Sequence, residues 1–240
     1  MEKSRDLLIF GRNAVREALR AKRVTSLLIS EAFSDKESLD LIKLQNLEYK
    51  RVSNGELDNK AKGEKHQGVI AFVKPYEYLD FNEIIRRSKK KDNPIIVILD
   101  GINDPHNMGA ILRSCDIFGV SGIVISRHNQ IPLNGTVAKT SVGAINYVPV
   151  ALVNNLNNAI KTLKENGFWI VSSDGSASTN YNELNYDFPV ALVIGSEGEG
   201  VSNLVLKNSD YIIKIPQQGH INSLNASVAA GIILSRIANK

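Results

Sequence analysis

The chain of 240 residues is 43% hydrophobic and has a formal net charge of +4, so it can bury a large core in one domain or two. No apolar run approaches the ~18 residues of a membrane span, and the N-terminus lacks the apolar segment of a signal peptide. The single cysteine, Cys115, excludes an internal disulfide and a cysteine-rich metal site. These features predict a cytoplasmic protein.

The N-terminal part, residues 1–74, has the pattern of a small α/β unit. Apolar residues at helical spacing predict one helix directly after Gly11-Arg12-Asn13 and another over 35–47. Strands are predicted over 24–30, 49–53 and 69–73. A basic linker is predicted over 75–93, with a short helix over 81–87 inside it.

Most of the positive charge lies in these first segments. Residues 1–92 contain 20 Lys and Arg against 15 Asp and Glu, whereas residues 93–240 contain 9 against 10. Such a basic surface is either only solvated or binds a polyanion such as nucleic acid.

Strands and helices alternate through the rest of the chain, residues 94–240, which we expect to be a second domain. Strands are predicted over 95–99, 122–126, 147–150, 168–173, 190–194 and 211–215, and helices over 108–118, 135–141, 156–164 and about 223–237. Alternation of this kind predicts an α/β fold with a mainly parallel sheet that is covered on both faces.

The first strand, loop and helix of this domain run from Ile95 to Val120. A polar loop ends at Asn107, at the carboxyl end of the strand, where α/β proteins bind ligands. Arg113 is six residues further on, so we expect both side chains to overhang the same strand end, although an isolated arginine is as readily a solvated surface residue. His106 is interpreted as a hydrogen-bonding surface residue and not as a base.

Two further loops follow strands. The loop 195–202 has three glycines in six residues, which suits backbone held close to a ligand or in a positive-φ conformation. The loop 216–225 opens a helix of small residues, and Asn222 or Ser223 is expected to cap that helix.

Several other chemistries lack their signatures. The chain has no GxGxxG dinucleotide fingerprint, no Walker loop and no GxSxG elbow. The four histidines show no metal-ligand spacing, and Glu197 and Glu199 have no partnered carboxylate for hydrolysis.

Together the three loops resemble the three motifs of the SpoU/TrmH-type ribose 2′-O-methyltransferases of the SPOUT class. The matching segments are 104–113 (DPHNMGAILR), 194–200 (IGSEGEG), and Ile215-Pro216 with Ser223-Leu224-Asn225. In the N-terminal part, 11–15 (GRNAV) and 66–69 (HQGV) resemble the substrate-binding domain of the subgroup that methylates a guanosine of large-subunit (23S) ribosomal RNA.

This resemblance implies an enzyme that uses S-adenosylmethionine and needs no metal. It also implies a C-terminal trefoil knot, which is an exception among folds, and a homodimer with the site near the subunit interface. Backbone groups at Gly195, Ile215 and Leu224 are expected to hold the cofactor. The functional side chains implied by the motifs are Asn107, Arg113, Glu197, Ser223 and Asn225. With the charge distribution, Arg12, Arg20, Lys22 and Arg23 are the expected RNA contacts.

Arg113 is the group expected to activate the ribose hydroxyl. An arginine base would have to release a proton from a group with a pKa above ~12, so we expect it to stabilise developing charge and clamp a phosphate; a phosphate-assisted base is the alternative. Asn107, Glu197 and Asn225 are expected to hold Arg113 and the ribose, and Ser223 to contact the ribose or the cofactor.

Rival functions are a transfer-RNA target, a non-catalytic RNA-binding protein of the same fold, and a nucleotide-binding oxidoreductase. The missing dinucleotide fingerprint disfavours the oxidoreductase, and the intact Asn107, Arg113 and Glu197 disfavour the non-catalytic protein.

Overall fold

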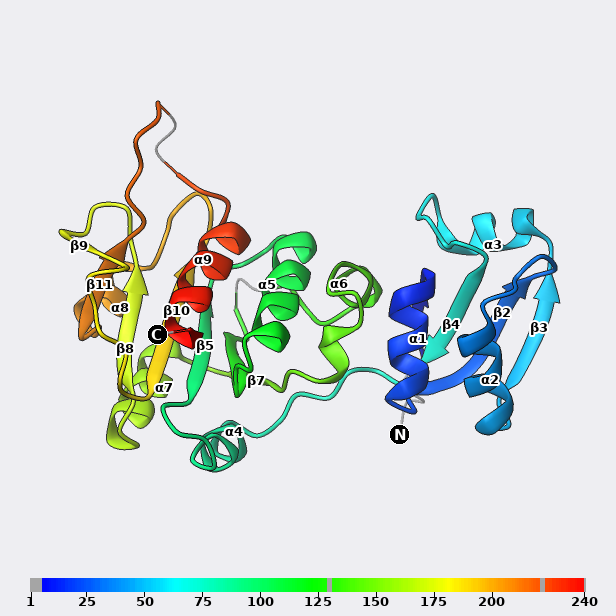
Figure 1. The fold of residues 1–240 in the computed structure, drawn as a ribbon, viewed down its shortest axis with the longest axis horizontal. Helices are drawn as coiled ribbons and strands as arrows, with labels where there is room; N and C mark the ends of the chain where they lie inside the picture. The colour runs from blue at the N-terminus through cyan, green and yellow to red at the C-terminus, as the bar shows by residue number, and fades with distance from the viewer. Residues whose placement is uncertain (1–5, 129–130, 221–222, 240) are drawn as a thin grey trace. The chain divides into compact units, whose positions relative to one another are not determined.

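The computed structural model describes residues 6–128, 131–220 and 223–239 (Figure 1). The chain divides into two compact units. Unit 1 comprises residues 1–77 and 132–147, and unit 2 comprises residues 78–131 and 148–240. None of the helices in the described ranges is long and apolar enough to cross a membrane.

Unit 1 is built on a four-stranded mixed sheet in the order β1-β4-β2-β3. Its strands are β1 (Leu7–Phe10), β2 (Val24–Ser30), β3 (Glu48–Val52) and β4 (Val69–Val73). β2 and β3 are parallel, whereas β4 runs antiparallel to β1 and β2. The helices of this unit are α1 (Arg12–Arg20), α2 (Lys36–Leu44), α3 (Asn54–Ala61), α6 (Gly135–Thr140) and the 3₁₀ turn η1 (Ala144–Asn146).

The helices of unit 1 form where a side chain caps the first turn or where an apolar face of the helix can be buried. α1 buries Ala14, Val15, Ala18 and Leu19, as the spacing predicts. Asp35 caps α2 by accepting a hydrogen bond from the Ser38 backbone N–H at 3.1 Å. Ser53 caps α3, a helix that the sequence analysis missed, as it missed β1.

Unit 2 is organised around seven strands in the order β7-β6-β5-β10-β8-β11-β9, and every neighbouring pair is parallel. The strands are β5 (Ile95–Asp100), β6 (Gly122–Ser126), β7 (Val150–Val153), β8 (Trp169–Ser173), β9 (Thr179–Asn180), β10 (Val190–Gly195) and β11 (Tyr211–Lys214). The predicted α/β fold with a parallel sheet is therefore confirmed. The strand expected over 147–150 starts three residues later, after the turn η1.

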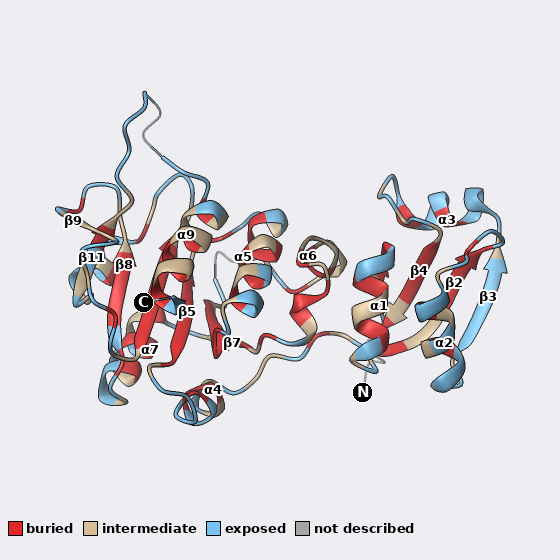
Figure 2. Ribbon diagram, in the orientation of Figure 1, coloured by how far each residue is buried: buried red, intermediate tan, exposed pale blue. Residues whose placement is uncertain are grey.

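Helices cover both faces of this sheet. α4 (Phe81–Ser88), α7 (Leu156–Glu165) and α8 (Asn203–Lys207) contribute to one apolar core with alternate residues of the central strands. α5 (Pro105–Ile117) and α9 (Ala226–Ala238) pack against one another, and α9 contacts β10. Figure 2 shows the central strands almost wholly buried between these layers.

The units differ from the predicted domains in two respects. Helix α4 lies inside the predicted linker, yet it buries Ile84 and Ile85 in the core of unit 2. Its charged residues face outward, where Arg86 and Arg87 hydrogen-bond to Glu83 and lower the pKa of that carboxyl to about 2. The charged residues that suggested a linker therefore belong in part to the outer face of an amphipathic helix.

The second difference is the segment 132–147, which belongs to unit 1 by its contacts. Gly135 lies directly against the backbone carbonyl of Leu8, where a Cβ would not fit. Lys139 forms an ion pair with Glu64 at 2.6 Å and lies over the ring of Phe10. These pairings join residues about 75 or more positions apart, which local spacing does not reveal.

Candidate active site

The first two motif loops begin side by side because their strands are neighbours. β5 and β10 are paired in parallel, and Gly195 at the end of β10 is in register with Asp100 at the end of β5. The loop after β10 is closed on itself by reciprocal backbone hydrogen bonds between Ser196 and Gly200. Asp100 also accepts a hydrogen bond from the Ser202 backbone N–H at 2.8 Å, so the first loop holds the second.

One residue from each motif meets in a hydrogen-bonded network. The Asn107 amide donates to Glu197 Oε1 at 2.9 Å, and the Asn225 amide donates to Asn107 Oδ1 at 2.9 Å. Asn225 also donates to Glu197 Oε1. Asn107 is 6% exposed, whereas Glu197 and Asn225 lie at the surface. The structure thus brings together three of the side chains that the motifs implied.

The cap of α9 fixes the direction of every bond in this network. Asn225 Oδ1 accepts from the backbone N–H groups of Ser227 and Val228, so its NH₂ group must face the network. Its donation occupies Asn107 Oδ1, which turns the Asn107 NH₂ group toward Glu197. The predicted caps were wrong: Asn225 is the cap, Ser223 precedes it, and Asn222 lies outside the described residues.

Arg113 does not join this network within one chain. Six residues of α-helix turn the direction of a side chain by roughly a third of a turn and advance it by about 9 Å, so Asn107 and Arg113 point to different sides of α5. Arg113 is exposed and has no hydrogen bond or ion pair with any residue that the structure describes. The expected support of Arg113 by Asn107, Glu197 and Asn225 is therefore absent from the isolated chain.

A cavity of about 140 Å³ lies between the second and third motif loops. All three residues expected to hold the cofactor through backbone groups line it, and so does Ser223; the set is Gly195, Ile215, Ser223 and Leu224. A Cβ at Gly195 would overlap the backbone of Gly200 and Val201, so only glycine allows this close approach. Asp174 and Gly175, which follow β8, also line the cavity. The sequence analysis missed them, although an Asp-Gly pair directly after a strand was a usable signal.

A larger cavity, about 750 Å³, lies on the other side of the glycine loop. Ser196, Glu197 and Gly200 line both cavities, and Asn107 lines the larger one. The network of Asn107, Glu197 and Asn225 therefore lies at the border between two spaces.

Cys115 and His106 lie on the helix that begins at the first motif, but neither is assigned a catalytic role. Burial raises the pKa of the Cys115 thiol, so Cys115 in α5 is a packed residue and not a nucleophile. His106 is exposed, and its backbone N–H donates to Asp104, the cap of α5. No cluster of potential metal ligands occurs among the described residues.

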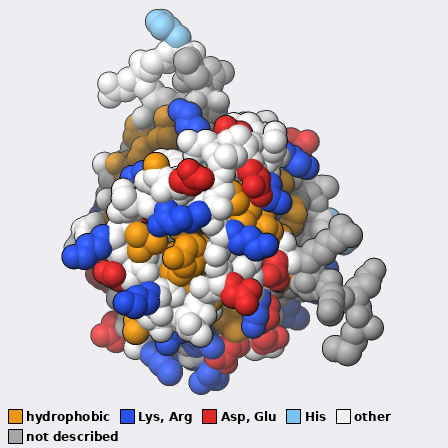
Figure 3. Space-filling model, turned by 90° about the vertical axis from the view of Figure 1, so that its right-hand side faces the viewer, with side chains coloured by type: hydrophobic (Ala, Val, Ile, Leu, Met, Phe, Trp, Pro, Cys, Tyr) orange, Lys and Arg blue, Asp and Glu red, His pale blue; other side chains and the backbone are white. Residues whose placement is uncertain are grey.

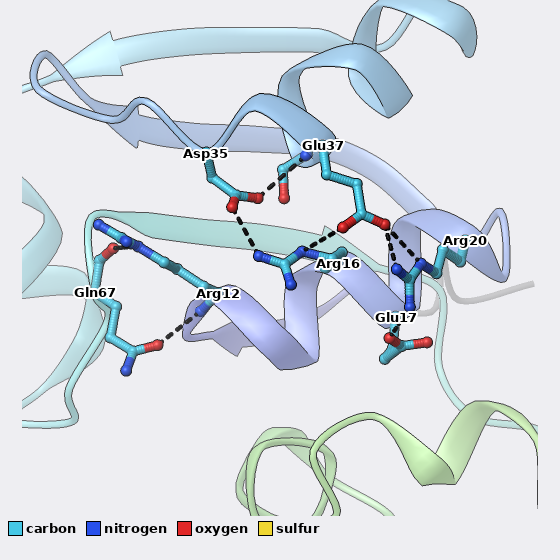
Figure 4. A network of polar contacts seen from close by, with 8 residues as sticks. Arg12, Arg16, Glu17, Arg20, Asp35, Glu37 and Gln67 are labelled. Carbon is cyan, nitrogen blue, oxygen red and sulfur yellow. Dashed lines mark hydrogen bonds and ion pairs between the residues drawn. The ribbon is translucent and has the colours of Figure 1, made fainter.

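The residues expected to contact RNA have different surroundings in unit 1, and Figure 4 shows those of Arg12 and Arg20. Arg20 pairs with Glu17 at 2.6 Å and also with Glu37. Arg23 donates to the backbone carbonyls of Lys74 and Pro75, and its guanidinium lies 4.6 Å from the ring centroid of Tyr76. These two arginines therefore already have partners within unit 1.

Arg12 and Lys22 lie at opposite ends of α1 and are both exposed. Arg12 donates to the Gln67 backbone carbonyl through Nε at 3.3 Å, which leaves the rest of its guanidinium available. Lys22 follows the helix at a positive φ of 55° and has no ion pair within the described part of unit 1.

Comparisons with known proteins identify the class to which this fold and site belong. The SpoU rRNA Methylase family model matches residues 94–235, and the model for RNA 2′-O ribose methyltransferase substrate binding matches residues 8–79. The chain belongs to the SpoU/TrmH family of RNA ribose 2′-O-methyltransferases.

Individual relatives and solved structures are similar to this chain over most of its length. A Staphylococcus haemolyticus protein named for the TrmH family of tRNA/rRNA methyltransferases is 43% identical over 98% of this chain and 96% of its own length. The structure of the SpoU methyltransferase AviRb from Streptomyces viridochromogenes, in complex with AdoMet, matches with a TM-score of 0.81 at 24% identity, over 98% of this chain and 89% of that one. The TrmH/SpoU tRNA modifying enzyme of A. aeolicus is 31% identical and matches with a TM-score of 0.57, over 66% of this chain and 81% of that one.

The family uses S-adenosylmethionine, and the residues that line the smaller cavity suit this cofactor. The walls combine small residues, among them Ala226 and Ala229, with the apolar Ile194 and Leu224, which suits a flat ring system held by backbone groups. Asp174 lines the same cavity. Its Oδ1 atom accepts hydrogen bonds from Ser176, which leaves Oδ2 for the cationic end of the ligand. When bound there, the cofactor supplies an electrophilic methyl group.

Proposed function

We propose that this enzyme methylates the ribose 2′-hydroxyl of a guanosine in large-subunit ribosomal RNA and acts in the cytoplasm. The observation that carries the proposal is the network of Asn107, Glu197 and Asn225 at the border of the cofactor cavity. The two-unit architecture supports the choice of RNA. An rRNA methyltransferase from Sinorhizobium meliloti matches over 98% of this chain with a TM-score of 0.81, whereas the tRNA modifying enzyme matches over 66%.

In the proposed site, Glu197 positions the ribose. Its Oε1 atom already accepts two amide hydrogen bonds, which fixes the carboxylate plane. The Oε2 atom has no partner among the described residues and is free to accept a hydrogen bond from a ribose hydroxyl. Alignment of the ribose oxygen with the methyl carbon supplies much of the acceleration of an in-line displacement.

Arg113 is proposed to stabilise the charge that develops on the ribose oxygen and to bind an adjacent phosphate. Its planar guanidinium can form paired hydrogen bonds to phosphate oxygens. Since Arg113 points away from the network of its own chain, we propose that it serves the site of a second subunit in a homodimer.

The helices that carry the site support this dimer. Arg113 and Ile117 are four residues apart on α5 and therefore share one face. Ile117 is 67% exposed, and Val228 at the start of neighbouring α9 is 47% exposed. Exposed apolar side chains near Arg113 favour a second subunit that covers them. We further propose that the last segment forms the trefoil knot of the family, with the loops of the smaller cavity as its crossing.

A methyl-transfer assay tests the function. Labelled S-adenosylmethionine is incubated with protein and transcripts of either large-subunit rRNA fragments or transfer RNA. The labelled nucleotide is then mapped by the resistance of its 3′-phosphodiester to alkali, because methylation blocks attack by the 2′-oxygen. We expect label at one guanosine of the rRNA fragment. Label only in transfer RNA would favour that substrate instead, and cofactor binding without transfer to either RNA would favour a non-catalytic protein.

Unit 1 is proposed to supply RNA affinity, through Arg12, Lys22 and the exposed Lys65. Lys65 lies next to α1, because its backbone carbonyl is 3.8 Å from a Cβ built at Gly11. The face of the molecule in Figure 3 shows lysines and arginines interspersed with carboxylates around a few apolar side chains, without one continuous basic patch. On this face, RNA phosphates would therefore contact individual cations and not one basic patch.

We expect the pair of changes Lys22→Asn and Lys65→Gln to weaken RNA binding and flatten its salt dependence. Each lost phosphate contact should reduce the slope of log K against log salt by about 0.7 to 0.9. Asparagine is chosen at position 22 because it tolerates a positive φ. The measurement is a series of binding titrations from low to high salt.

The matched control is Arg20→Gln, since Glu17 and Glu37 already neutralise Arg20. Its salt slope should equal that of the unchanged protein. Identical slopes for all variants would contradict the RNA-binding role of these lysines.

A further inference from the structure

The larger cavity has the size and position to receive the base attached to the reacting ribose. Its volume of about 750 Å³ is within the range of small-molecule sites. It adjoins the cofactor cavity along the glycine loop, so a ribose placed at Glu197 would extend its base to the side opposite the cofactor. The remaining walls come from the ends of β5, β6 and β7 and the start of α7.

The charges of this cavity exclude a phosphate and favour a neutral ring with N–H groups. Four carboxylates line it, Asp100, Asp104, Glu197 and Glu199, and no lysine or arginine is among its described lining residues. Asp100 and Asp104 are engaged by backbone N–H groups. Glu199 is exposed and its carboxylate has no partner among the described residues. A base that offers hydrogen-bond donors would satisfy it.

A chain of amide hydrogen bonds fixes the direction of one further wall residue, Asn157. Asn208 in the turn after α8 donates from Nδ2 to the Leu204 backbone carbonyl at 3.0 Å, and a carbonyl can only accept. The same Nδ2 donates to Asn157 Oδ1 at 2.8 Å. The Asn157 oxygen is therefore occupied, and its NH₂ group has no partner among the described residues and remains as a donor on a residue that lines the cavity.

We propose that the Asn157 side chain donates a hydrogen bond to an acceptor atom of the target base and so helps to select that base. Asn208 is the residue that positions Asn157. The proposal rests on the proposed function, in which the target is a guanosine. Guanine presents the acceptor O6 beside two donors, the N1–H and the N2 amino group, whereas no other standard base combines one acceptor with two adjacent donors. Asn157 supplies the donor for O6, and a carboxylate such as that of Glu199 accepts from the other two groups.

Asn157→Asp is the most direct test, because it replaces the NH₂ donor of the side chain by an oxygen acceptor and keeps nearly the same shape. The aspartate can still accept the hydrogen bond from Asn208. A carboxylate in the first turn of α7 interacts favourably with the helix dipole, so the variant should fold. We expect kcat/KM on the guanosine target to fall roughly tenfold to a hundredfold, the discrimination that one base contact provides.

A second substrate separates base reading from a general loss of activity. In RNA that carries 6-thioguanosine at the target position, sulfur replaces O6 and accepts hydrogen bonds weakly, while both donors remain. The unchanged enzyme should prefer guanosine over 6-thioguanosine, and Asn157→Asp should lose this preference. Asn208→Leu frees the Asn157 amide to rotate, so it should reduce the same preference without removing it.

Asn158→Asp is the matched control, because Asn158 is the next residue of α7 but does not line the cavity. It should keep both the activity and the preference of the unchanged enzyme. If the unchanged enzyme methylates guanosine and Asn157→Asp keeps its preference, the base-reading role is wrong and the proposed function stands. If the unchanged enzyme methylates no guanosine in any RNA, the proposed function fails, and this assignment fails with it.

Discussion

Arg113→Ala is expected to lower kcat by about a thousandfold while cofactor affinity and thermal stability stay near those of the unchanged protein. Removal of one group that stabilises charge in a transition state typically costs a hundredfold to a thousandfold, and Arg113 is also proposed to bind a phosphate. The fold should tolerate the change because the side chain is exposed and has no partner among the described residues. Calorimetric titration with S-adenosylmethionine, thermal unfolding and single-turnover methyl transfer measure the three quantities.

Arg113→Lys should be nearly as inactive, because lysine keeps the charge but lacks the planar fork. Arg86→Ala is the control: Arg86 is also an exposed arginine, on α4, and among the described residues it pairs with Glu83. Near-normal turnover of Arg113→Ala would contradict the assignment of Arg113 to the reaction.

Mixing two inactive variants tests whether Arg113 acts on the partner's site. If it acts across the interface, a heterodimer of Arg113→Ala with a variant that cannot bind cofactor contains one intact site. Activity should then return to a substantial fraction of the unchanged value when subunits exchange. If Arg113 acts within its own chain, the mixed dimer has no complete site and remains inactive.

Gly195→Ala is expected to weaken S-adenosylmethionine binding by more than a hundredfold. The added methyl group would overlap the backbone of Gly200 and Val201, and a backbone neighbour cannot rotate away as a side chain can. The glycine loop must therefore move, and the backbone groups that line the cofactor cavity move with it. Isothermal titration gives the change in affinity directly.

Gly198→Ala provides the matched control in the same loop. A Cβ at Gly198 meets nothing within 4 Å, and its φ is not in the positive range. Cofactor affinity should change by less than about twofold. Equal losses at both positions would mean that general loop flexibility, and not close backbone packing at Gly195, determines binding.

The sequence predicted the elements whose signals are local. The β-branched run of β5 and the helical spacing of α5 needed no distant information. Gly119 follows the C-cap of α5 in the left-handed conformation, at a φ of 64°, which is also a local signal. β1 and β9 were missed because four- and two-residue strands depend on their pairing partners. α3 was missed because its eight residues bury only Leu57 and Ala61.

The site was predictable only in part, because its contacts join residues that are far apart in the sequence. Asn107, Glu197 and Asn225 were chosen through resemblance to a family, and nothing in their spacing indicated that they would meet. Arg113 was placed beside Asn107 by sequence distance, but the helical turn separates them. The charges of Arg20 and Arg23 were visible in the sequence, whereas the carboxylates and carbonyls that engage them were not.

The cap of α9 also determines when the enzyme can become active. Asn225 reaches Asn107 across 118 positions of sequence, and it orients the amides only once α9 has formed behind it. A ribosome synthesises this helix after both earlier motifs, so a nascent chain that contains only those two motifs still has an unassembled site. Slow closure of such a distant contact separates synthesis from activity. Assembly of the network therefore requires that α9 has been synthesised and folded.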